Sequence, residues 1–134
     1  MAISYQIENT GIPLSNELLI QMYSTMLKIR MFEERIIEVY PVQDMQCPVH
    51  LCIGEEAIAA GVCLNLKKED YIFSTHRNHG HCVAKGSDMK LMMAEFYGKK
   101  TGYSKGKGGS MHMVDPENGI LGTSAIVGGA IPLA

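Results

Sequence analysis

An arginine among histidines is the first group of residues in this sequence that could do chemistry. Arg77 lies within residues 74–81, together with His76, His79 and His81. A guanidinium stays charged at every working pH and holds phosphate oxygens in bidentate fashion. Arg77 is therefore a candidate phosphate ligand, and the alternative is a simple salt bridge to one of the carboxylates of the chain.

A glycine-rich segment at residues 102–112, the glycine loop, is the second such group. It differs from a P-loop because three residues rather than four separate Gly102 from Gly106, and Gly108 stands where Ser or Thr would bind magnesium. We exclude ATP or GTP binding on that ground. Consecutive glycines can still aim backbone N–H groups at an anion, with Lys105 and Lys107 adding charge. The alternative is a tight surface turn with solvated lysines.

The three histidines and the neighbouring Cys82 also raise the question of a zinc site. Their spacing, H-x-x-H-x-H-C, matches none of the usual structural zinc patterns, and no second cysteine pair lies at a finger-like distance. Gly80 and Gly86 favour a bending backbone over a fixed cage of ligands. We therefore assign no metal ligand to this sequence.

His50 lies in an apolar stretch just before Gly54. A lone histidine in such a place is more often a hydrogen-bonded core residue. The functional alternative is a group that titrates near neutral pH and donates or accepts a proton, or orients a substrate carboxylate, at the lip of a pocket. The residues alone favour the core interpretation.

Two helices are predicted before the histidine cluster. Apolar residues at a spacing of three and four predict an amphipathic helix from Ser15, a residue suited to an N-cap, to Tyr40, with Pro41 as a stop. Alanine-rich residues 54–66 predict a second helix. Its small face would permit close packing against another element, and this face consists of Ala57, Ala60 and Gly61.

The elements around the two chemical groups follow the same logic. Residues 71–75 are β-branched and aromatic and predict a short inner strand, which would deliver Arg77 at its carboxyl end, where open α/β sheets bind ligands. Residues 88–98 predict a helix that Asp88 caps. From Lys99 to Gly122 the periodicity disappears, and a long loop in a compact domain is usually functional or an interface.

Length and composition limit the classes of function. The 134 residues fit one domain, and a net charge of −2 with 19% charged residues gives no reason to expect nucleic acid or an anionic membrane as a partner. No apolar run approaches the roughly 20 residues that cross a bilayer, and residues 1–10 lack the order of a secretory signal. We expect a cytoplasmic protein whose cysteines are reduced and buried. These cysteines are Cys47, Cys52, Cys63 and Cys82.

Five motifs, in order, resemble the alpha subunit of thiamine-diphosphate-dependent 2-oxo acid dehydrogenases of the pyruvate and acetoin type. They lie at residues 50–57, 74–81, 84–86, 102–112 and 126–128. The Thr-His-Arg form most resembles acetoin dehydrogenase, since pyruvate and branched-chain enzymes usually place Tyr before the Arg. The resemblance implies an α/β fold in which residues 1–134 form the amino-terminal part of a thiamine-diphosphate-binding domain. Its expected features are a long N-terminal helix, an incomplete parallel sheet and a long glycine-rich loop.

The resemblance also implies roles for five residues. The pair that grips the cofactor diphosphate falls on His76 and Arg77. The main-chain carbonyl and amide that meet the aminopyrimidine fall on Ala125 and Val127, and Ala in place of the family glycine is tolerated if Ala125 has a negative φ. His50 matches the family histidine at the reacting end of the cofactor, where it would donate or orient a proton.

The reaction that the resemblance implies is cleavage of a carbon–carbon bond in a 2-oxo acid or acetoin, with transfer of the acyl group to lipoamide. Thiamine diphosphate would act as the electron sink. The implied partners are a beta subunit, which carries the catalytic glutamate of the family, and a lipoyl-bearing acyltransferase, within an oligomer such as a heterotetramer.

The family's magnesium ligands, a Gly-Asp-Gly stretch and a later asparagine, come after the position that matches Ala134. We therefore expect the Mg²⁺ ligands to lie outside this sequence and the isolated chain to be inactive. The alternative is a non-catalytic interaction module derived from the same fold.

Overall fold

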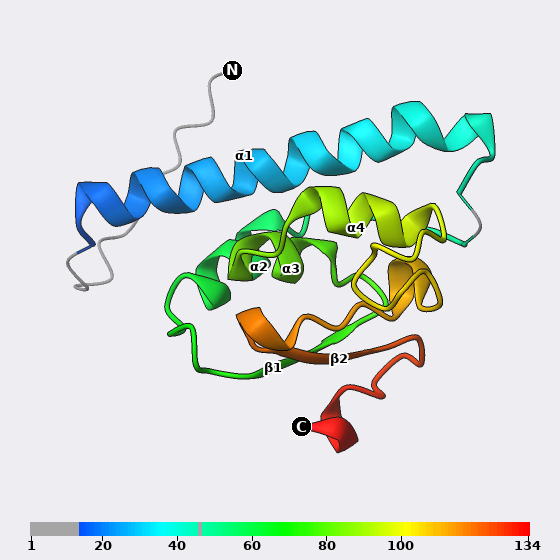
Figure 1. Cartoon of the computed structure of the whole chain (residues 1–134). Helices are drawn as coiled ribbons and strands as arrows, with labels where there is room; N and C mark the ends of the chain where they lie inside the picture. Colours follow the sequence, from blue (N-terminus) through cyan, green and yellow to red (C-terminus); the bar gives the residue numbers. More distant parts are fainter. Residues whose placement is uncertain (1–13, 46) are drawn as a thin grey trace.

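The computed structural model describes residues 14–45 and 47–134, so the first ten residues, considered above for a secretory signal, lie outside the described part. This part has three layers (Figure 1). The long helix α1 (Asn16–Val39) lies across the shorter helices α2, α3 and α4, and these separate it from a two-stranded sheet. Among the described helices, none is long and apolar enough to cross a membrane.

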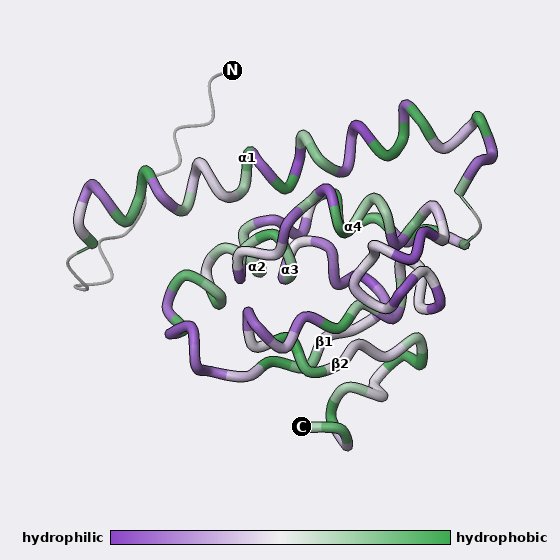
Figure 2. Tube along the Cα trace, in the orientation of Figure 1, coloured by the Kyte–Doolittle hydropathy of each residue, from purple (hydrophilic) through white to green (hydrophobic). Residues whose placement is uncertain are grey.

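Helix α1 forms as the sequence predicts. The Ser15 hydroxyl caps it by accepting a hydrogen bond from the Leu18 N–H at 3.1 Å, and the helix gives way to a 3-10 turn, Tyr40–Val42, that contains Pro41. Figure 2 shows hydrophobic and hydrophilic residues alternating along α1. The predicted cap and stop are confirmed. The predicted apolar stripe is buried at Ile29, Phe32 and Ile36, but Leu19 and Tyr40 near its two ends are exposed.

Helix α2 (Glu56–Cys63) buries a different face from the predicted one. Ala60 is buried as expected, but Ala57 is exposed, and a Cβ at Gly61 would have no neighbour within 4 Å. The prediction was therefore wrong for Ala57 and Gly61. The buried face consists of Glu56, Ala59, Ala60 and Cys63, and Glu56 forms an ion pair of 2.7 Å with Arg30 of α1.

Helix α3 (His79–Lys85) packs closely on α2 because it contains Gly80. A Cβ there would lie 3.0 Å from the Ala59 Cβ, tighter than most real contacts. The predicted bend in the backbone occurs at Gly86, which ends α3 with φ of 99°, but the bend at Gly80 is wrong. Gly80 serves a close approach between two helices rather than a turn.

Strands β1 (Ile72–Thr75) and β2 (Ile120–Ser124) form a parallel pair. The β1 prediction is confirmed, but β2 was not predicted. Its first three residues fall in the predicted loop from Lys99 to Gly122, and its last two were assigned to no element. The segment Ile-Leu-Gly-Thr-Ser has a central glycine and weak strand propensity, and it becomes a strand by pairing with β1. An α/β architecture is therefore correct.

Helix α4 (Met89–Phe96) begins and ends as predicted. The Asp88 side chain accepts a hydrogen bond from the Lys90 N–H at 2.7 Å, and Gly98 follows the helix with φ of 63°. The chain between α4 and β2 contains two 3-10 turns, Gly109–Met111 and Pro116–Asn118.

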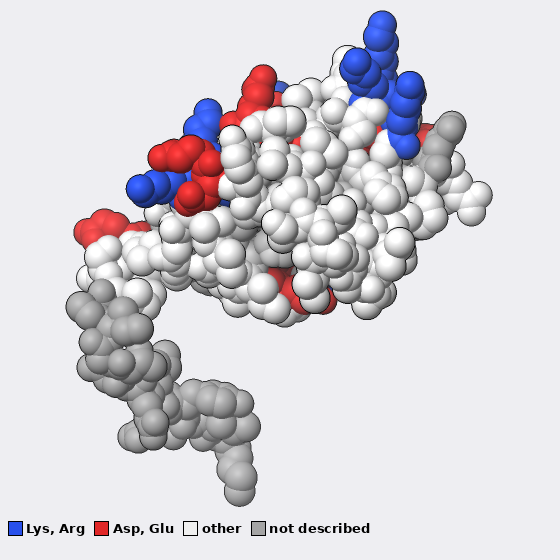
Figure 3. Space-filling model, turned by 90° about the horizontal axis from the view of Figure 1, so that it is seen from below, with Lys and Arg blue, Asp and Glu red and all other residues white. Residues whose placement is uncertain are grey.

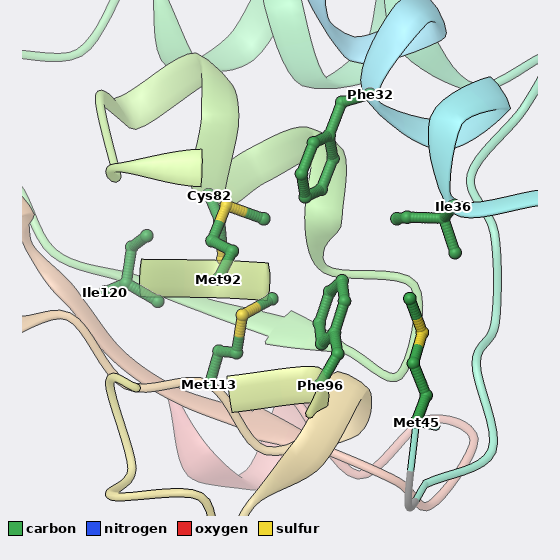
Figure 4. Close-up of a cluster of buried hydrophobic side chains, with 8 residues drawn as sticks. All are labelled: Phe32, Ile36, Met45, Cys82, Met92, Phe96, Met113 and Ile120. Atoms are coloured by element: carbon green, nitrogen blue, oxygen red, sulfur yellow. The ribbon is translucent and has the colours of Figure 1, made fainter. Parts of the chain in front are cut away.

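One hydrophobic cluster joins the layers, as Figure 4 shows. It takes side chains from α1, α3, α4 and β2 and from the loops between them. Each fully buried large side chain contributes roughly 1.5–3 kcal/mol to stability, so the cluster fixes the helices over the sheet. Its members are Phe32, Ile36, Met45, Cys82, Met92, Phe96, Met113 and Ile120.

Candidate functional site

The candidate site lies beyond the carboxyl ends of the two strands. Thr75 of β1 pairs with Ser124 of β2 in parallel register, so His76 and Ala125 are the next residues at the same edge of the sheet. Open α/β sheets bind ligands at this edge. The pairing therefore brings two segments of the predicted site, far apart in the sequence, to neighbouring positions.

Arg77 turns back toward the segment that carries His50. Its Nη1 donates a hydrogen bond to the main-chain carbonyl of Leu51, and its backbone N–H donates to the Thr75 hydroxyl at 3.2 Å. The side chain is half-buried rather than extended into water. Because a guanidinium has several N–H donors in a planar fork, this one contact fixes the group while leaving donors for a ligand.

His50 and His76 form an edge-to-face pair. Their ring centroids lie 5.1 Å apart with an interplanar angle of 89°. The Nδ1 atom of His76 is buried and has no hydrogen-bond partner, which holds for no other buried side-chain nitrogen or oxygen in the described residues. An unsatisfied buried polar atom costs about 1–3 kcal/mol of stability. A ligand that forms a hydrogen bond with Nδ1 would therefore remove this cost.

Ala125 and Val127 lie in the exposed segment that follows β2. The Ser124 hydroxyl anchors this segment by accepting a hydrogen bond from the Ile126 N–H at 3.2 Å. Ala125 is not among the described residues with positive φ, so it meets the condition set for its main-chain role. Val127 is 84% exposed, so its side chain is not part of the core.

His79 belongs to the interior and not to the edge of the sheet. Its Nδ1 lies 2.6 Å from Glu33 Oε1, and its Nε2 lies 2.7 Å from the Ser110 hydroxyl. The order serine, histidine, carboxylate matches a catalytic triad. All three residues have 0% exposure, however, so no substrate reaches the hydroxyl, and the group is a structural connection between α1, α3 and the glycine loop.

His81 has a different hydrogen-bond partner from His79. The Ser74 hydroxyl lies 3.0 Å from its Nδ1, and burial lowers the pKa of His81, opposed by the nearby Glu55 charge. His76, His79 and His81 thus have different partners and do not converge. The described residues contain no group of three or more His, Cys, Asp or Glu side chains that could hold a metal ion.

The glycine loop does aim its N–H groups at an anion, but that anion is a residue of this chain. Glu95 of α4 accepts hydrogen bonds from the N–H groups of Ser104 and Gly106 on one oxygen, at 2.8 and 2.9 Å. Its other oxygen accepts from Gly108 and Gly109, at 2.8 and 3.0 Å. Lys105 and Lys107 are exposed, as the surface-turn interpretation expects.

Sequence reasoning missed the burial of Glu33 and Glu95. A signal was available, since each lies inside an apolar helical stripe. Glu33 follows Phe32 and precedes Ile36, and Glu95 lies between Met92 and Phe96. A carboxylate on a core face needs internal donors, which predicts a polar network at both positions.

Burial raises the pKa of the four cysteine thiols. Three of these cysteines are buried as predicted, whereas Cys47 is only half-buried. Burial raises the pKa of Cys52 to about 12, so this thiol does not ionise near neutral pH.

The hydrogen bond from Arg30 holds the pKa of Glu56 below its usual value, and the Gly54 N–H adds to this effect.

A parallel pair of strands covered by helices defines an α/β architecture. The chain belongs to the family of the dehydrogenase E1 component, whose model matches residues 23–134. It is 50% identical over 128 residues to the alpha subunit of acetoin:2,6-dichlorophenolindophenol oxidoreductase from Bacillus subtilis (strain 168), covering 96% of this chain and 38% of that protein.

Two further relatives show the same pattern. The corresponding subunit from Cupriavidus necator is 46% identical over 126 residues, which cover 94% of this chain and 38% of that protein. The pyruvate dehydrogenase E1 component subunit alpha of Zymomonas mobilis is 43% identical over 118 residues, covering 87% of this chain and 33% of that protein. The chain thus spans little more than a third of the length of these relatives. The family resemblance read from the motifs is confirmed.

Proposed function

We propose that this chain supplies the diphosphate-binding part of a thiamine-diphosphate site in a dehydrogenase alpha subunit, with residues 1–134 forming the amino-terminal part of that domain. One observation carries the proposal. The buried, unpartnered Nδ1 of His76 lies in the residue next to the half-buried Arg77, at the carboxyl edge of the sheet. Membership in the dehydrogenase E1 family supports the choice of cofactor.

The residues at this edge suit the proposed cofactor. Arg77 would hold diphosphate oxygens through its free N–H donors, and His76 would donate from Nδ1. The main chain of Ala125 and Val127 would receive the aminopyrimidine. His50, in contact with the His76 ring, would hold or pass a proton at the reacting end.

When bound, thiamine diphosphate supplies the electron sink for cleavage of a carbon–carbon bond next to a carbonyl. The substrate class is acetoin or a 2-oxo acid, and the relatives named above carry both acetoin and pyruvate in their names. We infer that the acyl fragment passes to a lipoyl group on an acyltransferase and that a beta subunit completes the site. We infer that the ligands of Mg²⁺ lie outside the 134 residues of this sequence.

The direct test uses this chain joined to the remaining segment of a full-length relative and combined with a beta subunit. Calorimetric titration with thiamine diphosphate and Mg²⁺ should show binding, and acetoin and 2-oxo acids should then be compared as substrates. The isolated chain should release no carbon dioxide from pyruvate under the same conditions. Absence of cofactor binding by the assembly would favour the non-catalytic interaction module.

A paired substitution tests the role of Arg77 in that assembly. Arg77→Ala should weaken thiamine diphosphate binding by about 2 kcal/mol, because a hydrogen bond to a charged group is lost. Lys99→Ala, which removes an exposed cation of the loop, should leave the affinity close to the wild-type value. Equal effects of the two substitutions in the titration would return Arg77 to the role of a surface charge.

A further inference from the structure

Glu95 is a carboxylate enclosed by backbone N–H groups. It is 1% exposed, and its two oxygens accept the four N–H bonds from the glycine loop described above. A carboxylate offers about four lone-pair sites, so these donors saturate it. Such a concave array of N–H groups is a known kind of anion site, and here the anion comes from the same chain.

The glycine loop is built around this side chain. A Cβ at Gly102 would lie 2.5 Å from Glu95 Oε2, so any larger residue would displace the carboxylate. Gly109 has φ of 61°, a conformation that side chains disfavour, and this turn delivers its N–H to Glu95. Gly102 and Gly109 therefore serve the internal anion, and the N–H groups that bind Glu95 are not free for a phosphate from outside.

The loop in turn holds the residues that follow Arg77. Ser110 comes directly after Gly109, and its hydroxyl contacts His79 Nε2 at 2.7 Å. Its carbonyl accepts a hydrogen bond from Asn78 Nδ2 at 2.9 Å, and the same amide donates to the Thr75 carbonyl at 3.3 Å. Two bonds thus join Ser110 to Asn78 and His79, the two residues that follow Arg77, and a third joins Asn78 to the end of β1.

We propose that Glu95 is a positioning residue for the Arg77 turn, acting through the glycine loop, Ser110 and Asn78. This inference rests on the proposed function, because the turn matters only if Arg77 meets the cofactor. Loss of the carboxylate releases Gly108 and Gly109, and Ser110 then no longer holds Asn78 and His79 in one place. The guanidinium loses its preset direction while its chemistry is unchanged.

Glu95→Gln tests this in the full-length protein with its partner subunits. The amide keeps the size of the side chain but turns an NH₂ group toward N–H donors, which breaks about half of the array. We expect thiamine diphosphate to bind about tenfold more weakly, as for a small misplacement of a binding group, with kcat at saturating cofactor close to the wild-type value. Glu117→Gln, an exposed carboxylate of the following 3-10 turn, is the matched control and should bind as wild type.

The outcomes separate the inference from the function beneath it. If the wild-type protein binds the cofactor and Glu95→Gln binds it equally well, the positioning role is overturned and the proposed function stands. If Glu95→Gln lowers kcat at every cofactor concentration and leaves the affinity unchanged, positioning is also overturned. If the wild-type protein does not bind thiamine diphosphate, both the proposed function and this inference are overturned.

A second measurement needs no variant and tests the premise of the inference, that Glu95 occupies the glycine loop. Hydrogen exchange of the wild-type protein should show the amides of Gly106, Gly108 and Gly109 protected before any ligand is added, because Glu95 already binds them. Inorganic pyrophosphate should leave this protection unchanged. A change in exchange at these amides on adding pyrophosphate would mean that the loop receives the anion itself, and would overturn the inference.

Discussion

At the residue scale, His79 is held in the interior by its hydrogen bond to Glu33 and by aromatic packing. Neither side chain has any exposure to water, and Phe32 and Phe96 lie against the imidazole with ring centroids at 6.4 and 5.0 Å. Glu33 has one further donor, the Cys52 N–H at 3.2 Å. The stability of this region therefore depends on the imidazole remaining in place.

His79→Ala should lower the free energy of unfolding by about 3 kcal/mol or more, because the Glu33 carboxylate stays buried without its main donor. Urea unfolding of the purified protein measures the change. His112→Ala, which removes an exposed histidine at the end of the glycine loop, should have little effect. A loss no greater than that of the His112 variant would show that Glu33 finds another partner.

His81 gives the molecule a defined response to acid. Burial lowers its pKa in the folded state, so the neutral ring is favoured there and the unfolded chain takes up the proton first. The stabilisation is fully present above the unfolded pKa of about 6.5 and is lost as the pH falls below it. Urea midpoints between about pH 7.5 and 5 should fall less for His81→Gln than for wild type, while His112→Gln should follow the wild-type curve. Parallel curves for all three proteins would contradict this account.

At the scale of elements, α2 and α3 approach each other closely. Ala59 is buried against Gly80, and the two helices leave no room for a larger side chain. This packing holds α3 beneath α1, and α3 carries the residues that follow Arg77. Small residues on both helices are what permit it.

Ala59→Leu should destabilise the protein by about 1–3 kcal/mol, since the added carbons must displace α3. Ala57→Leu is the control on the same helix, because Ala57 is exposed and both changes have the same effect on helix propensity. Thermal unfolding of the two variants gives the comparison. Equal melting temperatures would show that α3 can shift without cost.

On the scale of the whole molecule, the face below the sheet is nearly free of charge. Figure 3 views this face, and Lys, Arg, Asp and Glu gather mainly at its rim. Large apolar side chains are exposed in the segment after β2, among them Ile126 at 75% and Ile131 at 82%. An apolar face of this kind favours association with another protein surface.

We expect the chain to associate in a concentration-dependent way through this face. Ile131→Lys should weaken association by placing a charge in the apolar area, as sedimentation velocity at increasing concentration would show. Ile20→Lys changes an exposed apolar residue of α1, in the opposite layer of Figure 1, and should leave association unchanged. If only Ile20→Lys weakened association, the interface would lie on α1 instead.

Some of this structure was predictable from short stretches of sequence. Ser15 and Asp88 marked the starts of α1 and α4, the apolar spacing gave the length of α1, and the β-branched residues before His76 gave β1. The motif order also indicated the dehydrogenase E1 family. Helix caps and periodic stripes act between residues three or four apart, so the local sequence contains all the information they need.

Other features depended on contacts between residues far apart in the chain. β2 exists because it pairs with β1, Glu95 is the anion of the glycine loop from 9 to 14 residues away, and Arg77 meets the carbonyl of Leu51 across 26 residues. The sequence by itself determined α1, α2 and α4, the first strand and the family. Only the tertiary structure decided which carboxylate fills the loop and which imidazole lies against His50, because a hydrogen-bonding group accepts any partner that the packing of the layers brings within reach.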